Sequence, residues 1–201
     1  MMCSKAIVRF AFLTSLLVLS RLLPAQSIMV IGGDASVRNC YLNASSELNL
    51  LEPSARLLEP CDYALAHVPL SQRDIAAIHS NRGIILAALG RYTEALVDYE
   101  RSIALIPDKA ENFINRGNLY FYLGAFADAI QDYSHALTLS ATLSHIALTN
   151  RGISHEQREE LDAALADYLA ALELMPGWPA AEERRVRVSE KIRASQNKRA
   201  E

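Results

Sequence analysis

The fold is decided by residues 81–107, which read NRGIILAALGRYTEALVDYERSIALIP. The opening Asn-Arg-Gly triplet of this stretch returns at residues 115–117 and again at residues 150–152, at intervals of 34 and 35 residues. A fixed period of this size predicts a solenoid, in which one supersecondary unit is stacked several times.

Other positions keep the same phase as the triplet. An alanine stands 12 residues after each glycine, a tyrosine 16 after it and a serine or alanine 19 after it: Ala95, Ala129 and Ala164; Tyr99, Tyr133 and Tyr168; Ser102, Ala136 and Ala171. In the first unit the pattern predicts two helices, over about 76–89 and 93–105, because Pro107 cannot continue a helix. The glycine of the first helix and the alanine of the second lack bulk, so the two helices can approach closely. The tyrosine fills the space beside them.

These positions resemble the signature of the tetratricopeptide repeat family: a small residue at Gly83, an A-x-x-x-aromatic motif from Ala95 to Tyr99, and the closing Pro107. The resemblance covers about 76–178 and implies an all-α fold, a right-handed α-solenoid of helical hairpins. The sequence departs from the family pattern in the arginine before each glycine, and where Arg158-Glu159 replaces Leu-Gly in the third unit.

The resemblance divides the chain into successive segments. Three repeats are expected at 76–109, 110–143 and 145–178, with a capping helix and tail at 179–201. Residues 41–75 are interpreted as a degenerate hairpin, because Cys61 stands 34 positions before Ala95, where a small residue is required. Residues 28–40 are expected to form an extended leader.

Residues 1–27 have the pattern of a secretory signal peptide. Lys5 and Arg9 precede an apolar run of 11 residues, whereas a helix that spans a bilayer needs about 20. Cleavage is expected after Ala25 or Ser27. The alternative is a signal anchor that is not cleaved. The chain also resembles small exported bacterial repeat proteins, and this resemblance implies that the mature chain is in the periplasm.

Export would remove Cys3 and leave Cys40 and Cys61. Two cysteines in an oxidising compartment permit one intramolecular disulfide, which we expect here. The alternative is that each cysteine is a small buried side chain.

The sequence contains no motif of a catalytic or cofactor site that we recognise: HExxH, CxxC, GxSxG and a phosphate-binding glycine-rich loop are all missing. His135, His145 and His155 recur every ten residues, a spacing that does not place them on one helical face. We therefore expect no enzyme, no cofactor and no metal. The net charge of −3 argues against a nucleic-acid partner.

An aspartate follows the arginine of each triplet by 16 residues, which gives the pairs Arg82 and Asp98, Arg116 and Asp132, and Arg151 and Asp167. Since the helices of a hairpin run antiparallel, these residues are predicted to form structural ion pairs. A ladder of arginines that binds anions is the alternative.

The asparagine of each triplet, Asn81, Asn115 and Asn150, falls on the first helix of its hairpin. In this family that helix lines the concave groove, and the resemblance extends to superhelices in which an asparagine ladder holds an extended peptide. The groove lining is expected to include Ile84, Asn118, Ile153, Phe121 and Tyr122. The alternative is that each asparagine satisfies a neighbouring helix.

The predicted function is a non-catalytic scaffold that binds a protein or peptide. A self-associating structural solenoid is one alternative. A membrane-tethered assembly factor is another, if the signal is not cleaved.

Overall fold

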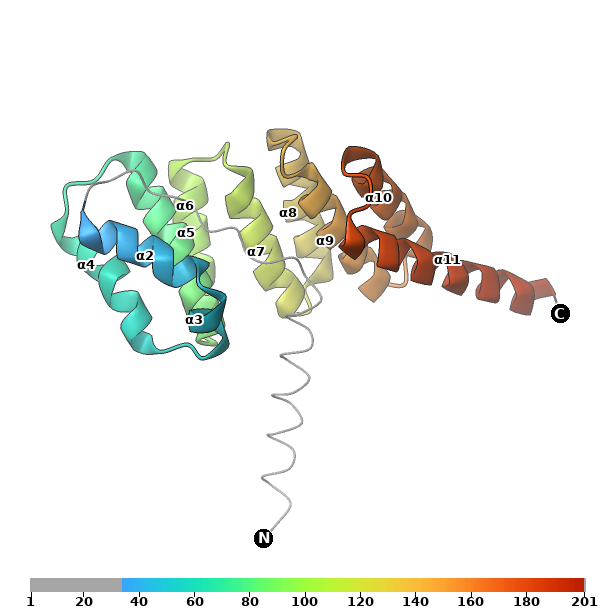
Figure 1. Ribbon diagram of the computed structural model, residues 1–201, viewed down its shortest axis with the longest axis horizontal. Coiled ribbons are helices and arrows are strands. Elements are labelled where there is room, and N and C mark those ends of the chain that lie inside the picture. Colours follow the sequence, from blue (N-terminus) through green and yellow to red (C-terminus); the bar gives the residue numbers. More distant parts are fainter. Residues whose placement is uncertain (1–33, 201) are drawn as a thin grey trace, which may run out of the picture.

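The computed structural model describes residues 34–200 as a row of helices (Figure 1). The predicted signal peptide, 1–27, and the start of the predicted leader lie outside the described residues. In chain order the elements are α2 (Ala35–Ser45), α3 (Glu47–Leu51), the 3-10 helix η1 (Ala55–Leu58), α4 (Glu59–His67), α5 (Gln72–Ala88), α6 (Tyr92–Leu105), α7 (Ala110–Tyr122), α8 (Phe126–Leu139), α9 (Ser144–Gln157), α10 (Leu161–Leu174) and α11 (Pro179–Ala200). None of the helices within 34–200 combines the length and apolarity needed to cross a membrane.

The three predicted repeats are the hairpins α5–α6, α7–α8 and α9–α10, which confirms the all-α solenoid. The first of these helices begins four residues earlier than expected, because the Ser71 hydroxyl oxygen accepts a hydrogen bond from the Asp74 amide and caps it. The hairpins lie side by side along the row, and α11 follows them at the C-terminal end (Figure 1).

Each hairpin is held together by a tyrosine ring that lies against the backbone of a glycine. A Cβ atom added to the glycine would lie within 2.7–2.8 Å of a ring carbon, in the pairs Gly83 and Tyr99, Gly117 and Tyr133, and Gly152 and Tyr168. All three tyrosines are buried. The small residues predicted that the two helices of a hairpin approach each other closely, and this close approach is present in every repeat.

The prediction that residues 28–40 form an extended leader was wrong for its last six residues, which belong to α2. Asp34 caps this helix, since its carboxylate accepts a hydrogen bond of 2.7 Å from the Ser36 amide. Val37, Cys40 and Ala44 are buried and recur at spacings of three and four, which places them on one face. This face packs against α4 and α5, so α2 is the first helix of the N-terminal hairpin.

Cys40 of α2 and Cys61 of α4 form the predicted disulfide, with their Cα atoms 4.8 Å apart. Both residues are fully buried. The bond joins the two helices of the degenerate hairpin to each other.

The turns between the paired helices need a residue in the left-handed region. Gly90 and Gly124 supply it in the first two repeats, with φ of 76° and 78°. In the third repeat Glu159 takes this conformation with φ of 58°, the only described residue other than glycine with a positive φ. The replacement of Leu-Gly by Arg158-Glu159 therefore leaves the turn intact, but it places a strained residue in the turn.

We expect the change C40A/C61A to lower the free energy of unfolding by about 3 kcal/mol, because the bond closes a loop of 21 residues in the unfolded chain. Chemical denaturation of the variant and of the wild type under non-reducing conditions measures the difference. Equal unfolding free energies would count against a disulfide that stabilises the hairpin.

We expect Glu159→Gly to raise the unfolding free energy by about 1 kcal/mol, because glycine adopts a positive φ without the cost that a Cβ imposes. Gly124→Ala is the matched reverse change, since a Cβ at Gly124 meets nothing within 4 Å and only the backbone responds. It should destabilise by a similar amount. The explanation fails if both changes shift thermal unfolding in the same direction.

Candidate peptide-binding face

The first helices of the three hairpins make up one face of the solenoid. Helix α5 contacts α7, and α7 contacts α9. Among the described helices, no comparable contact joins the second helices α6, α8 and α10 to one another. The main contact between hairpins runs from each second helix to the next first helix, but only the first helices also contact one another, so they line the inner side of the curve.

The predicted asparagine row lies on these helices, one residue in each of α5, α7 and α9. Asn81, Asn115 and Asn150 are exposed by 0%, 1% and 0%. Their side chains are thus buried within the stack in this structure.

Two of these asparagines bridge neighbouring hairpins. The Asn115 amide donates to the Ser80 hydroxyl at 3.3 Å, and the Asn150 amide donates to the Asn118 side-chain oxygen at 3.0 Å. The Tyr133 hydroxyl also donates to Asn118, at 2.8 Å. The alternative interpretation, in which each asparagine bonds to a neighbouring helix, is thus observed for Asn115 and Asn150. Contact of the asparagine row with a peptide stays a prediction.

The other residues predicted to line the groove differ in burial. Ile84, Ile153 and Phe121 are buried, whereas Asn118 and Tyr122 are partly exposed. The Tyr92 hydroxyl donates to the Tyr122 hydroxyl at 2.8 Å, which joins the first repeat to the second. The structure places these residues on the same first helices as the asparagine row.

The predicted ion pairs are present in all three repeats, and each is bidentate. The two hydrogen bonds measure 2.7 and 2.8 Å from Arg82 to Asp98, 2.8 and 2.7 Å from Arg116 to Asp132, and 2.9 and 2.6 Å from Arg151 to Asp167. The aspartates are at most 5% exposed. The recurring arginine therefore joins the two helices of its own hairpin.

The first of these pairs has an additional partner. His79 Nδ1 lies 2.9 Å from Asp98. Burial acts to raise the pKa of Asp98, but the hydrogen bonds from Arg82 and His79 outweigh it and hold that pKa below its usual value. The stability that Asp98 contributes is therefore lost as the pH falls through its lowered folded-state pKa.

Asp132 in the second repeat has no histidine partner of this kind, and Phe113 stands at the position equivalent to His79. Burial there outweighs the hydrogen bond from Arg116 and raises the pKa of Asp132. The folded state consequently holds the Asp132 proton more tightly than the unfolded state does. Folding is favoured at this site as the pH falls through that raised pKa.

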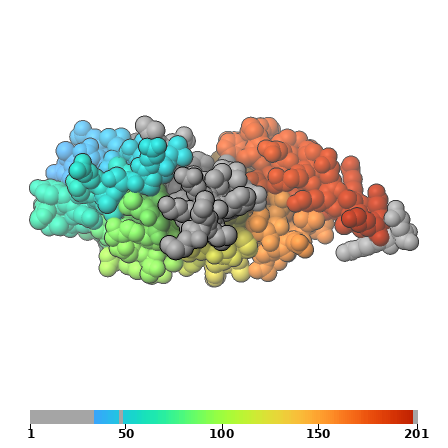
Figure 2. Space-filling view, turned by 90° about the horizontal axis from the view of Figure 1, so that it is seen from below, coloured from blue at the N-terminus to red at the C-terminus, as the bar shows by residue number. Residues whose placement is uncertain are grey.

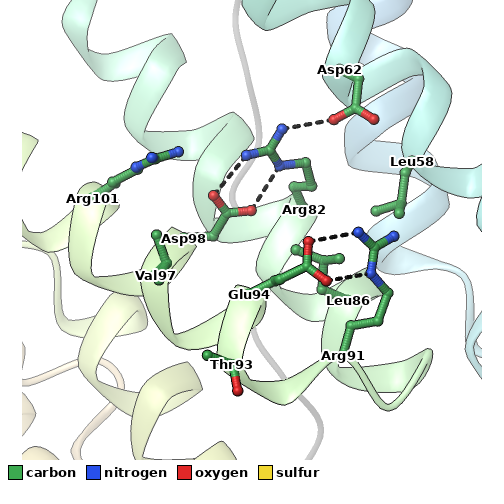
Figure 3. Close-up of a pocket in the computed structure, with 10 residues that line it drawn as sticks. All are labelled: Leu58, Asp62, Arg82, Leu86, Arg91, Thr93, Glu94, Val97, Asp98 and Arg101. Atoms are coloured by element: carbon green, nitrogen blue, oxygen red, sulfur yellow. Dashed lines mark hydrogen bonds and ion pairs between the residues drawn. The ribbon is translucent and has the colours of Figure 1, made fainter.

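A pocket of about 360 Å³ lies between α4, α5 and α6 (Figure 3). Its carboxylates are all bonded to arginines: Asp62 and Asp98 to Arg82, and Glu94 to Arg91. The acidic charges on its wall are therefore neutralised, while Arg101 lines the pocket outside these pairs. They form a structural network rather than a pair poised for acid and base chemistry.

Sequence reasoning missed the anchor of the last helix. The side chain of Glu156 of α9 is only 5% exposed, and it accepts hydrogen bonds from the Tyr168 hydroxyl at 2.6 Å and from Arg187 of α11 at 3.0 Å. Arg184 and Lys191 of α11 lie 3.6 and 3.7 Å from the same carboxylate. These three basic residues therefore attach α11 to the last hairpin, and their spacing of three and four residues along one helix was the available signal.

No group of three or more His, Cys, Asp or Glu side chains within residues 34–200 is arranged to hold a metal ion. His135 packs against Phe113, His145 against Trp178, and His155 lies 2.6 Å from Glu160. Each histidine of the ten-residue series thus has its own separate neighbour.

Two family models, both described as tetratricopeptide repeat, match residues 74–142 and 114–181. A comparison with curated proteins found no match. Several solved structures are similar to this chain over most of their own length.

The first TPR of Spaghetti (RPAP3) bound to the HSP90 peptide SRMEEVD is 27% identical, with a TM-score of 0.56, over 63% of this chain and 98% of that one. The second TPR domain of human RPAP3 in complex with the HSP70 peptide SGPTIEEVD is 25% identical, with a TM-score of 0.55, over 59% and 98%. The Sgt2 TPR domain from Aspergillus fumigatus is 18% identical, with a TM-score of 0.58, over 64% and 87%, and shares the fold.

We expect Arg116→Ala to lower the unfolding free energy by about 3–5 kcal/mol, because it leaves Asp132 buried without its guanidinium partner. The double change R116A/D132A should cost less than the single change. Arg101→Ala, which removes an exposed arginine, is the control. Denaturant unfolding measures all three variants, and equal costs for R116A and R101A would contradict a structural role for the pair.

Proposed function

Because the chain belongs to the tetratricopeptide repeat family, we propose that it is a non-catalytic scaffold that binds an extended segment of a partner protein along its first helices. The binding surface is the inner face formed by α5, α7 and α9. The observation that carries the proposal is the row of equivalent amides at Asn81, Asn115 and Asn150.

A regular row of amides suits a peptide backbone. An asparagine side chain both donates and accepts, as a peptide group does, and it selects no side chain of the ligand. Asn115 and Asn150 are buried and bonded to neighbouring hairpins, so a ligand that binds their amides must displace these hydrogen bonds.

The ligand class proposed here differs from the peptides in the two similar complexes. Those peptides, SRMEEVD and SGPTIEEVD, each carry three acidic residues. The arginine that recurs on the first helices of this chain is already paired with an aspartate in every repeat. Recognition through the ligand backbone therefore accounts for the repeated residues better than recognition of acidic side chains.

The compartment proposed is an oxidising, exported one, the bacterial periplasm. The signal-like pattern of residues 1–27 supports export, and the buried bond between Cys40 and Cys61 agrees with an oxidising environment.

The test is to select ligands for the purified protein from a random peptide library and to measure their affinity by titration calorimetry. Each Asn→Ala change should weaken binding by about 2-fold to 10-fold, the equivalent of 0.5–1.5 kcal/mol per hydrogen bond, and the triple change severely. N-methylation of the ligand backbone should weaken binding more than alanine scanning of its side chains.

Asn197→Ala, an exposed change on α11, is the matched control and should leave affinity unchanged. Circular dichroism must show that the triple variant is folded at the temperature of the titration. Unchanged affinity in a folded triple variant would place the binding surface elsewhere.

A further inference from the structure

The pocket of about 360 Å³ shown in Figure 3 lies where the N-terminal hairpin meets the first repeat. These two units pack directly on each other at one end of the row (Figures 1 and 2). The buried lining of the pocket includes Leu58 and Leu86, whereas Asp62, Thr93 and Arg101 are exposed. A cavity of about 300–1,000 Å³ that combines apolar lining with a few polar groups is typical of a small-molecule site.

The ion pairs of this pocket leave one group of each sign incompletely satisfied. Arg82 donates two hydrogen bonds to Asp98 and one to Asp62. Asp62 therefore shares a guanidinium that Asp98 already neutralises, and its side chain is 57% exposed. The guanidinium of Arg101 forms no ion pair or hydrogen bond with any side chain of residues 34–200.

Both groups depart from the repeat. The corresponding residues of the next two units, at intervals of 34 or 35 residues, are Leu96 and Ile130 for Asp62, and His135 and Ala170 for Arg101. The combination of an aspartate and an arginine at these two positions thus occurs once in the solenoid. A local departure from a repeated pattern is expected at a functional site.

A smaller side chain also leaves room at this junction. In the next unit Tyr120 stands at the position of Leu86, and the guanidinium of Arg116 lies over its ring, 5.8 Å from the ring centroid. Leu86 has no ring to place beneath Arg82. The space that an aromatic side chain takes in the second repeat is therefore part of the pocket in the first.

We propose that this pocket binds a short peptide with free termini, whose ammonium group lies on Asp62 and whose terminal carboxylate lies on Arg101. Figure 3 shows these two side chains on opposite sides of the pocket, with Arg82 and Asp98 between them. A single amino acid carries both charges on one carbon atom, so a ligand of about two or three residues is needed to reach both sides. Its apolar side chains lie against Leu86.

The site goes beyond the proposed function, because none of the residues that line it belongs to the asparagine row. The balance of charge decides the ligand class. Three arginines and three carboxylates line the pocket, so a simple anion or a simple cation meets no net opposite charge. An internal segment of a longer chain has no charged terminus and leaves both Asp62 and Arg101 unsatisfied.

Titration of isotope-labelled protein with the tripeptide Ala-Leu-Ala, followed by NMR, tests the proposal. We expect saturable shifts of amide signals from α4 and α6. Acetylation of the N-terminus of the probe or amidation of its C-terminus should each raise the dissociation constant by about tenfold, because each change removes one charge-assisted contact.

Two variants of similar size assign each contact. Arg101→Gln should bind the free tripeptide and its C-terminal amide with equal affinity, but still bind the acetylated form less tightly. Asp62→Asn should show the opposite pattern. Arg73→Gln changes an exposed arginine of α5 outside the pocket and should behave as the wild type does.

The proposal is overturned if the wild type shows no saturable shifts, or if the blocked tripeptides bind as tightly as the free one. It is equally overturned if Arg101→Gln still distinguishes the carboxylate from the amide by the wild-type factor. The last result would place the ligand carboxylate elsewhere.

Discussion

The close approach of a tyrosine ring to a glycine backbone is the contact on which the rest of this solenoid depends. It sets the distance between the helices of each hairpin, because a Cβ on Gly83 would fall 2.7 Å from a carbon of the buried Tyr99 ring. The arginine and aspartate of each ion pair precede that glycine and that tyrosine by one residue. The same approach therefore brings the guanidinium within hydrogen-bond distance of a carboxylate that is almost fully buried.

This contact also explains how the array ends. At α11 the glycine is replaced by Val186, and the aspartate partner of the arginine is replaced by Glu182 on the same helix. The helix is instead attached to the last hairpin through the buried carboxylate of Glu156. Ala181 and Val188 of α11 are also fully buried in the core with Tyr168, so the stack ends with an apolar contact to which a charged anchor is added.

The features that repeat could be predicted from the sequence, and most of those that occur once could not. The hairpins, the Gly–Tyr contacts and the ion pairs each appear three times, at intervals of 34 and 35 residues. The repeated pattern of the sequence therefore predicts them. The Cys40–Cys61 bond was predictable without repetition, because the expected export and loss of Cys3 leave a single pair. The α2 helix, the Glu156 anchor and the bond from Asn150 to Asn118 depend on contacts between segments that no period relates. For the asparagine row, the sequence gives the position on the first helices but not the burial of the side chains.

The central claim is tested most directly by the unfolding free energy of Gly117→Ala, in the wild type and in a Tyr133→Leu background. Helix propensity alone would make the alanine stabilising by about 1 kcal/mol. Overpacking against the Tyr133 ring, 2.8 Å from the new Cβ, should instead make it destabilising in the wild type, by a cost of about 1–3 kcal/mol that exceeds the propensity gain. In the Tyr133→Leu background the same change should be neutral or stabilising. An alanine that stabilises the wild type as much as the leucine variant would contradict the account.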